Sequence, residues 1–204
     1  MFALISDNQV SKYPINLRKE FPNISFPKDL SKATLPEGVV VVETSLVPSQ
    51  KYSDVKEGTP TLQNGIWSQT WVITPHTDEQ VKAELLAEVA QKKFQVTTGG
   101  ITLNGKLIKT DDASQQSILS AIVIGKQMGL TSVDFHESDD SYTTISMDDL
   151  VAISNAIGTH KQQSFSAAKA HYEAIAAIVA TQDKTVFQQY CEYDITTGWP
   201  NPTK

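Results

Sequence analysis

The sequence predicts an α+β protein in which a small, Pro-rich β region with long loops precedes β-hairpins packed on a medium and a long helix. Seven of the nine prolines fall in residues 1–75, and prolines at such spacing exclude helices longer than a turn or two. Asn-Gly pairs between short apolar runs predict β-hairpins. Farther along the chain, apolar residues recur at helical spacing, which predicts amphipathic helices.

Residues 1–75 are expected to form a β-rich N-terminal region. The strands are expected at Phe2–Ile5, at Gly38–Val42 and, after an Asn64-Gly65 turn, at Ile66–Ile73. Side chains alternate along a strand. One face of the last strand would therefore carry Trp67, Gln69, Trp71 and Ile73.

A helix over residues 76–93 is expected to link this region to the rest. Thr77 and Gln80 have the spacing of a capping box, in which each side chain bonds the backbone N–H of the other residue. Val81, Leu85 and Val89 then recur every four residues and would form one buried stripe.

Residues 94–204 are expected to form a C-terminal α+β domain. Its first part, Phe94–Met128, reads as a ribbon with turns at Gly99-Gly100 and Asn104-Gly105, followed by a helix that opens at Asp112, uses Gln115 in a capping box and stops near Gly129. A second ribbon pairs Ser132–His136 with Tyr142–Ile145 across Ser138–Ser141. Ser146 then caps a helix that runs to about Thr181. Beyond it, Trp199 would pin the tail to the core.

Composition and charge exclude several classes of function. The net charge of −6 and the pI near 5.2 argue against nucleic-acid binding, which rewards clustered Lys and Arg. Cys191 is the single cysteine, so an internal disulfide is impossible. The start of the chain lacks the pattern of a signal peptide, and no run reaches the length of a membrane span. We therefore expect a soluble protein without membrane contact.

The chemistry-bearing residues form no recognisable catalytic or metal-binding pattern. Three carboxylate pairs stand where helix caps and turns favour Asp, since its oxygens accept orphan backbone N–H groups. These pairs are Asp111-Asp112, Asp139-Asp140 and Asp148-Asp149. His160 and His171 are eleven residues apart on the long helix, too far for one metal ion, and are expected in a core or an interface. The sequence thus predicts a protein without enzymatic activity, cofactor or metal.

Aromatic side chains are the candidates for binding a protein partner. Trp and Tyr dominate the energetics of protein interfaces, but they equally suit the core of a small β domain. The candidate partner-binding residues are Tyr13, Phe26, Tyr52, Trp67, Trp71 and Trp199. The alanines of the long helix permit close packing within the chain or against another subunit, so self-association stays open.

The order of several motifs resembles tailed-bacteriophage proteins. The string KYPINLRKEFPNISFP at residues 12–27, the strand start Gly38-Val39, the Glu57–Pro60 step and the Asn64–Trp71 segment follow one another as in tail-fibre-associated proteins. The second half is similar to a phage domain of unknown function. It shares the segments Gly99–Gly105, Thr110–Gln115 and Tyr193–Pro200, together with His160.

The resemblance implies a place in a phage tail module and no enzymatic activity. One expectation is a structural adaptor or fibre component of the virion, made in the host cytoplasm and attached through residues 1–75 to tail-fibre or baseplate proteins. The other is an assembly chaperone that binds the fibre and then leaves. A glycan-processing enzyme would need two carboxylates about 5–9 Å apart in a cleft, for which the sequence has no sign.

Overall fold

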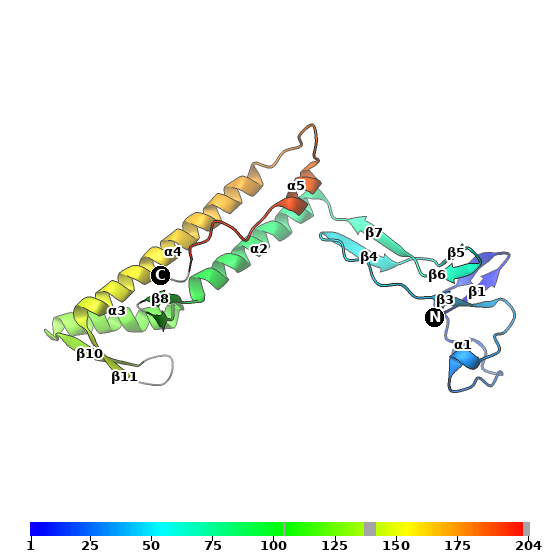
Figure 1. The fold of residues 1–204 in the computed structure, drawn as a ribbon, viewed down its shortest axis with the longest axis horizontal. Coiled ribbons are helices and arrows are strands. Elements are labelled where there is room, and N and C mark those ends of the chain that lie inside the picture. The colour runs from blue at the N-terminus through cyan, green and yellow to red at the C-terminus, as the bar shows by residue number, and fades with distance from the viewer. Residues whose placement is uncertain (104, 137–141, 202–204) are drawn as a thin grey trace. The chain divides into compact units, whose positions relative to one another are not determined.

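The chain folds into two compact units, Met1–His76 and Thr77–Lys204, in a computed structural model that describes residues 1–103, 105–136 and 142–201. Strands dominate the first unit, and helices with two short strand pairings make up the second, so the α+β prediction is confirmed (Figure 1). Each unit has its own buried residues and is described by itself below.

The first unit is built on a five-stranded sheet with the order β2-β1-β3-β6-β5. Its strands are β1 Phe2–Ser6, β2 Gln9–Lys12, β3 Val39–Glu43, β5 Thr61–Gln63 and β6 Ile66–Ser68. The expected Asn64-Gly65 turn is confirmed, with φ angles of 51° and 80° that a type I′ turn requires. Asp7 and Asn8 make the β1–β2 turn in the same way, with φ angles of 50° and 60°.

A small apolar cluster packs beside this sheet. Ile15, Leu17 and Val39 are its buried members, and partly buried residues, among them Phe26, pack against them. The short helix α1 (Leu17–Glu20), capped by Asn16, and the 3₁₀ turn η1 (Leu30–Lys32) fold the loop between β2 and β3 over this cluster. The long loops therefore supply much of the core of this unit.

The strand expected over Ile66–Ile73 is wrong, because the structure divides it between two partners. β6 ends at Ser68 and stays in the sheet, whereas β7 (Trp71–Pro75) pairs only with β4 (Ser53–Glu57) as a separate antiparallel ribbon. At the break, the backbone N–H of Gln69 donates to the carbonyl of Glu43 (2.8 Å) and its side chain is buried. The shared face of Trp67, Gln69, Trp71 and Ile73 therefore does not exist.

Two long helices run side by side through the second unit. These are α2 (Asp78–Thr98) and α4 (Met147–Ala176), with the short α5 (Val186–Glu192) packed on α2 (Figure 1). The expected stripe of Val81, Leu85 and Val89 is completely buried. Because α2 packs along α4 and continues to Thr98, it belongs to this unit rather than serving only as a link that ends near Lys93.

The other end of the second unit holds α3 (Asp112–Gln127) and two ribbons. The strands β8 (Ile101–Leu103) and β9 (Lys106–Ile108) form one, and β10 (Ser132–His136) and β11 (Tyr142–Ser146) form the other. Ile101, Ile118, Leu150 and Ile157 form the buried cluster between these elements. Phe94 and Val96, assigned to the first ribbon by sequence, lie in α2 instead.

The structure corrects several of the helix ends that the sequence predicted. Asp111, not Asp112, caps α3, since its carboxylate accepts the N–H of Ser114 (3.0 Å), while the Gln115 amide reaches back to carbonyl groups. Ser146 caps α4 as expected, but α4 ends at Ala176 rather than near Thr181. Asn104 and the Ser138–Ser141 turn lie outside the described residues.

Candidate functional site

The candidate aromatic residues are divided between the two units. Tyr13, Phe26, Tyr52, Trp67 and Trp71 lie in the first unit, and Trp199 lies in the second. Phe26 packs on the cluster of the first unit, and Tyr52 is buried with a φ of 56°. Both of these side chains therefore serve the fold, whereas the other four, each half-buried, have polar or pocket-lining surroundings.

A chain of hydrogen bonds joins Tyr13 to Trp71 across the first unit. The Tyr13 hydroxyl and the Gln69 amide (2.6 Å) both donate to Oε1 of Glu57. The side-chain oxygen of Gln69 accepts the backbone N–H of Ser45 (2.9 Å), and the indole N–H of Trp71 donates to the Ser45 hydroxyl (2.9 Å). The network thereby ties the β4–β7 ribbon to the loop after β3 and to the segment after β2.

The hydrogen bonds of this network shift the pKa values of Glu57 and Tyr13. The hydroxyl of Tyr13 and then the amide of Gln69 lower the pKa of Glu57 by bonding its anion. Burial, reinforced by the bond to Glu57 and its negative charge, raises the pKa of Tyr13 to about 12. A neutral phenol donating to a fixed carboxylate is an arrangement that holds three segments together, and neither group is poised to transfer a proton near neutral pH.

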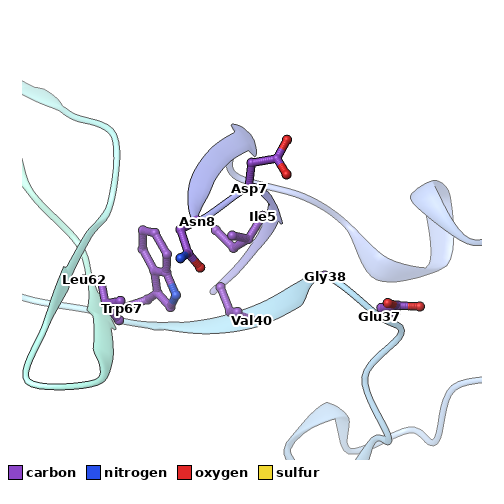
Figure 2. A pocket seen from close by; sticks show the side chains of 8 residues that line it. All are labelled: Ile5, Asp7, Asn8, Glu37, Gly38, Val40, Leu62 and Trp67. Carbon is purple, nitrogen blue, oxygen red and sulfur yellow. The ribbon is translucent and has the colours of Figure 1, made fainter.

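Trp67 lines an open pocket of about 660 Å³ on the first unit. Figure 2 shows its indole ring and the Asn8 amide facing this pocket, with the carboxylates of Asp7 and Glu37 turned away from the ring. Ile5, Gly38, Val40 and Leu62 complete the lining. The pocket thus offers an aromatic and apolar surface with one amide, which suits contact with a side chain better than a covalent reaction.

Trp199 pins the C-terminal tail to α4, as expected, and does so through His171. The indole stacks on the imidazole with ring centres 5.3 Å apart and an interplanar angle of 25°, and its N–H donates to the carbonyl of Ile195 (2.8 Å). The rings of Tyr193 and His171 are nearly perpendicular, with an interplanar angle of 82° and centres 5.8 Å apart. We call His171, Tyr193, Thr197 and Trp199 the tail lock.

The hydrogen bonds of the tail lock define the tautomer of His171. Its Nε2 lies 3.0 Å from the carbonyl of Thr197, which can only accept, so Nε2 carries the proton. Its Nδ1 lies 2.9 Å from the Tyr193 hydroxyl and, in the neutral ring, accepts from it. Burial, followed by the charge of Asp194, raises the pKa of Tyr193, which keeps this donor protonated.

His160 also has a structural role. It is buried, and its Nε2 lies 2.9 Å from the carbonyl of Val96, one of the last carbonyls of α2. The next turn cannot satisfy that carbonyl, because the N–H of Gly100 donates to the hydroxyl of Thr110 (3.0 Å) instead. His160 therefore caps the C-terminus of α2. The expectation of core histidines is confirmed for His160 and His171.

The carboxylate pairs serve as caps and surface groups where the structure describes them. Asp111 caps α3, Asp112 pairs with Lys161 (2.9 Å), and Asp149 both donates its N–H to Ser146 and accepts from the Ser146 hydroxyl. Asp139-Asp140 lies outside the described residues. Among the residues that are described, no three His, Cys, Asp or Glu side chains gather as metal ligands.

Among the described residues, no helix is both long enough and apolar enough to cross a bilayer.

The sequence analysis did not identify Ser45, Glu57 and Gln69 as members of the hydrogen-bond network. These residues come from three separate segments that meet only in the folded chain, so no local motif marks them. Tyr193 and Thr197 stand in a segment that the sequence did single out, although not as contacts of His171.

Residues 80–196 match the family model described as "Domain of unknown function (DUF4376)". The matched range covers more than half of the chain and includes α2 from Gln80 onward, the α3 end of the second unit and the tail as far as Thr196. It begins at Gln80, so the resemblance of residues 12–71 to tail-fibre-associated proteins stays a prediction. No match to the chain was found among curated proteins or among solved structures.

Proposed function

Since the chain belongs to the DUF4376 family, whose description assigns no function, we propose that it is a non-enzymatic structural component of a phage tail. In this proposal its first unit attaches to a tail-fibre or baseplate protein and its second unit is a stable helical body. The support for a phage tail is the order of sequence motifs in residues 12–71. The support for attachment is the surface of the first unit.

The β4–β7 ribbon carries the proposal. It stands outside the five-stranded sheet, and two-stranded ribbons are marginally stable in water. One face of it brings together Val55 opposite Ile73 and Glu57 opposite Trp71. Ile73 keeps 38% of its surface exposed. A neighbouring protein that covered this face would bury apolar area and stabilise the ribbon.

The segment before the ribbon points to the same conclusion. Leu46 is 94% exposed and Val47 is 60% exposed, in a stretch without helix or strand. Two adjacent apolar side chains left in water on an extended segment are typical of a surface that a partner covers. The sheet adds half-exposed Val41, Leu62 and Ile66 to the apolar surface of this unit.

The proposal is tested by incorporation of variants into virions. Ile73→Lys places a charge on the face of β7 that carries Trp71, and Thr74→Lys places the same charge one residue along, on the opposite face beside Asp54. We expect Ile73→Lys to fall at least tenfold in purified virions at equal expression and Thr74→Lys to be retained. Equal incorporation of two folded variants would contradict attachment through this face.

A further inference from the structure

A stripe of five exposed residues runs along α3, beside the side of the helix that makes its core contacts. These residues are Asp112, Gln116, Leu119, Val123 and Lys126, and they alternate at spacings of four and three. At 100° per residue this spacing keeps all five on one narrow face, which is the pattern of a helix that packs along another helix. The stripe belongs to the second unit alone.

A different side of α3 packs against the rest of the second unit. Ile118 is buried in the cluster of the second unit, and Ala121 and Ile122 pack against that cluster. A Cβ atom on Gly125 would lie 2.8 Å from the Met147 sulfur, so the helix sits tightly on the start of α4. The stripe therefore cannot turn inward to become the core face of α3.

The centre of the stripe is apolar and uncharged. Leu119 is 53% exposed and Val123 is 54% exposed, and no charged residue occurs between Asp112 and Lys126. Exposed faces of water-facing helices normally carry charged side chains. An apolar centre bounded by one acidic and one basic residue is instead the composition of an interface.

The positions of the two charges identify the partner. Leu119 stands midway between them, since 119 − 112 = 7 and 126 − 119 = 7. If a second copy of α3 lies antiparallel with its Leu119 opposite the first, each Asp112 faces the Lys126 of the other copy. A parallel pair would put Asp112 beside Asp112 and Lys126 beside Lys126, which is repulsive.

We infer that this chain forms a two-fold dimer through antiparallel α3 helices, with Leu119 at the symmetry axis. An antiparallel pair also sets the positive N-terminal end of each helix dipole beside the negative C-terminal end of the other. Lys161 already contacts Asp112, but the Asp112 side chain is 96% exposed and can accept a second cation. The dimer is independent of whether the protein resides in a tail.

A cysteine at the axis tests the geometry directly. Cys191 is the single cysteine of the chain, so the full-length variants are made in a Cys191→Ala background. Leu119→Cys should form a disulfide-linked dimer on mild oxidation, because residues on a two-fold axis meet their own copies. Ser117→Cys is the control: it is exposed on the same helix but 160° around from Leu119.

Exchanging the charges tests the pairing. Lys126→Asp alone and Asp112→Lys alone should each raise the dimer dissociation constant about tenfold, measured by sedimentation, because each creates two like-charge contacts. The double variant should return near the wild-type value. Each substitution also interacts unfavourably with the dipole of α3, so any loss of helix stability would be larger in the double variant than in either single variant. Recovery of association in the double variant therefore cannot come from helix stability.

A monomer at all concentrations, a trimer, or equal crosslinking of Ser117→Cys and Leu119→Cys would overturn the inference. Failure of the double variant to recover association, with its thermal unfolding unchanged, would overturn the antiparallel register. Selective crosslinking at Leu119 together with recovery by the double variant would establish it.

Discussion

At the scale of single residues, His171 is the side chain that holds the C-terminal tail against α4. Its imidazole bonds the tail twice and stacks on Trp199, all from one position of α4. Each of its two nitrogens has a defined role, so it needs no charge to hold the tail. These two hydrogen bonds explain how a polar residue can be buried on a helix whose buried face is largely apolar.

Replacement of His171 should therefore destabilise the second unit. We expect His171→Phe to lower the free energy of unfolding by about 2 kcal/mol, because a ring remains while the Tyr193 hydroxyl and the Thr197 carbonyl lose their partner. Chemical denaturation followed by Trp fluorescence measures this loss. His160→Phe serves as the comparison, since it uncaps α2 but leaves the fluorescence of Trp199 at its native value. An unchanged stability of His171→Phe would show that the tail lock contributes nothing.

Tyr13 gives the first unit a specific dependence on alkaline pH. Its pKa is raised from 10.0 to about 12, so its contribution to stability is complete below pH 10 and is lost as the pH rises toward 12. In an absorbance titration of the six tyrosines, we expect one ionisation near pH 12 that disappears in Tyr13→Phe. A Tyr13→Phe titration that retains the full late phase would assign that phase to another tyrosine.

The sequence predicted which residues would be packed better than it predicted which residues they contact. Trp199 docks as predicted, and both buried histidines were expected in packed surroundings. The grouping of Trp67 with Trp71 failed because strand alternation describes a continuous strand, and the buried Gln69 interrupts this one. Gln69 is held by Ser45 and Glu57, which lie far from it in sequence and so leave no local pattern.

At the scale of elements, caps decide where helices begin. Asp111 accepts from both the N–H (3.0 Å) and the hydroxyl (2.7 Å) of Ser114, whereas Asp112 is a solvent-exposed partner of Lys161. The hydrogen bonds from Ser114 lower the pKa of Asp111. Its contribution to stability is therefore present above the ordinary pKa of an aspartate and is lost as the pH falls through the lowered value.

The two adjacent aspartates should then differ on substitution. Asp111→Ala should cost about 1 kcal/mol of stability at neutral pH, as loss of an N-cap does. Asp112→Ala should cost less than about 0.5 kcal/mol, since exposed ion pairs contribute little. Urea unfolding of both variants, under conditions in which the chain is monomeric, measures the difference. Equal losses, or a larger loss for Asp112→Ala, would contradict the assignment of the cap.

Turn and cap motifs predicted which helices and strands exist more reliably than they predicted where each one begins and ends. The Asn64-Gly65 turn, β10, β11 and the start of α4 follow from turn and cap chemistry. The short α5 was missed although Thr185 and Gln188 form a capping box, and Asp7-Asn8 marks the β1–β2 turn equally well. The division of β6 from β7 could not be predicted, because the choice of β4 as a partner is a tertiary effect.

At the scale of the whole molecule, attachment of the first unit predicts a change in protease sensitivity. In the free protein we expect the first tryptic cut near Lys51, in the exposed stretch that follows Leu46 and Val47. The same site should be protected in intact virions, while the helical second unit resists cleavage in both forms. Equal rates of cutting at Lys51 in free protein and in virions would be inconsistent with attachment through this region.

The central claim is that this chain is a structural part of a tail, and its copy number in purified virions tests that claim most directly. Quantitative mass spectrometry would compare the chain with the tail-tube protein of the same particles. The account predicts a fixed ratio, set by the rotational symmetry of the tail and constant between preparations. Absence from virions, with the chain bound to fibre protein in the lysate of infected cells, would contradict it and identify an assembly chaperone.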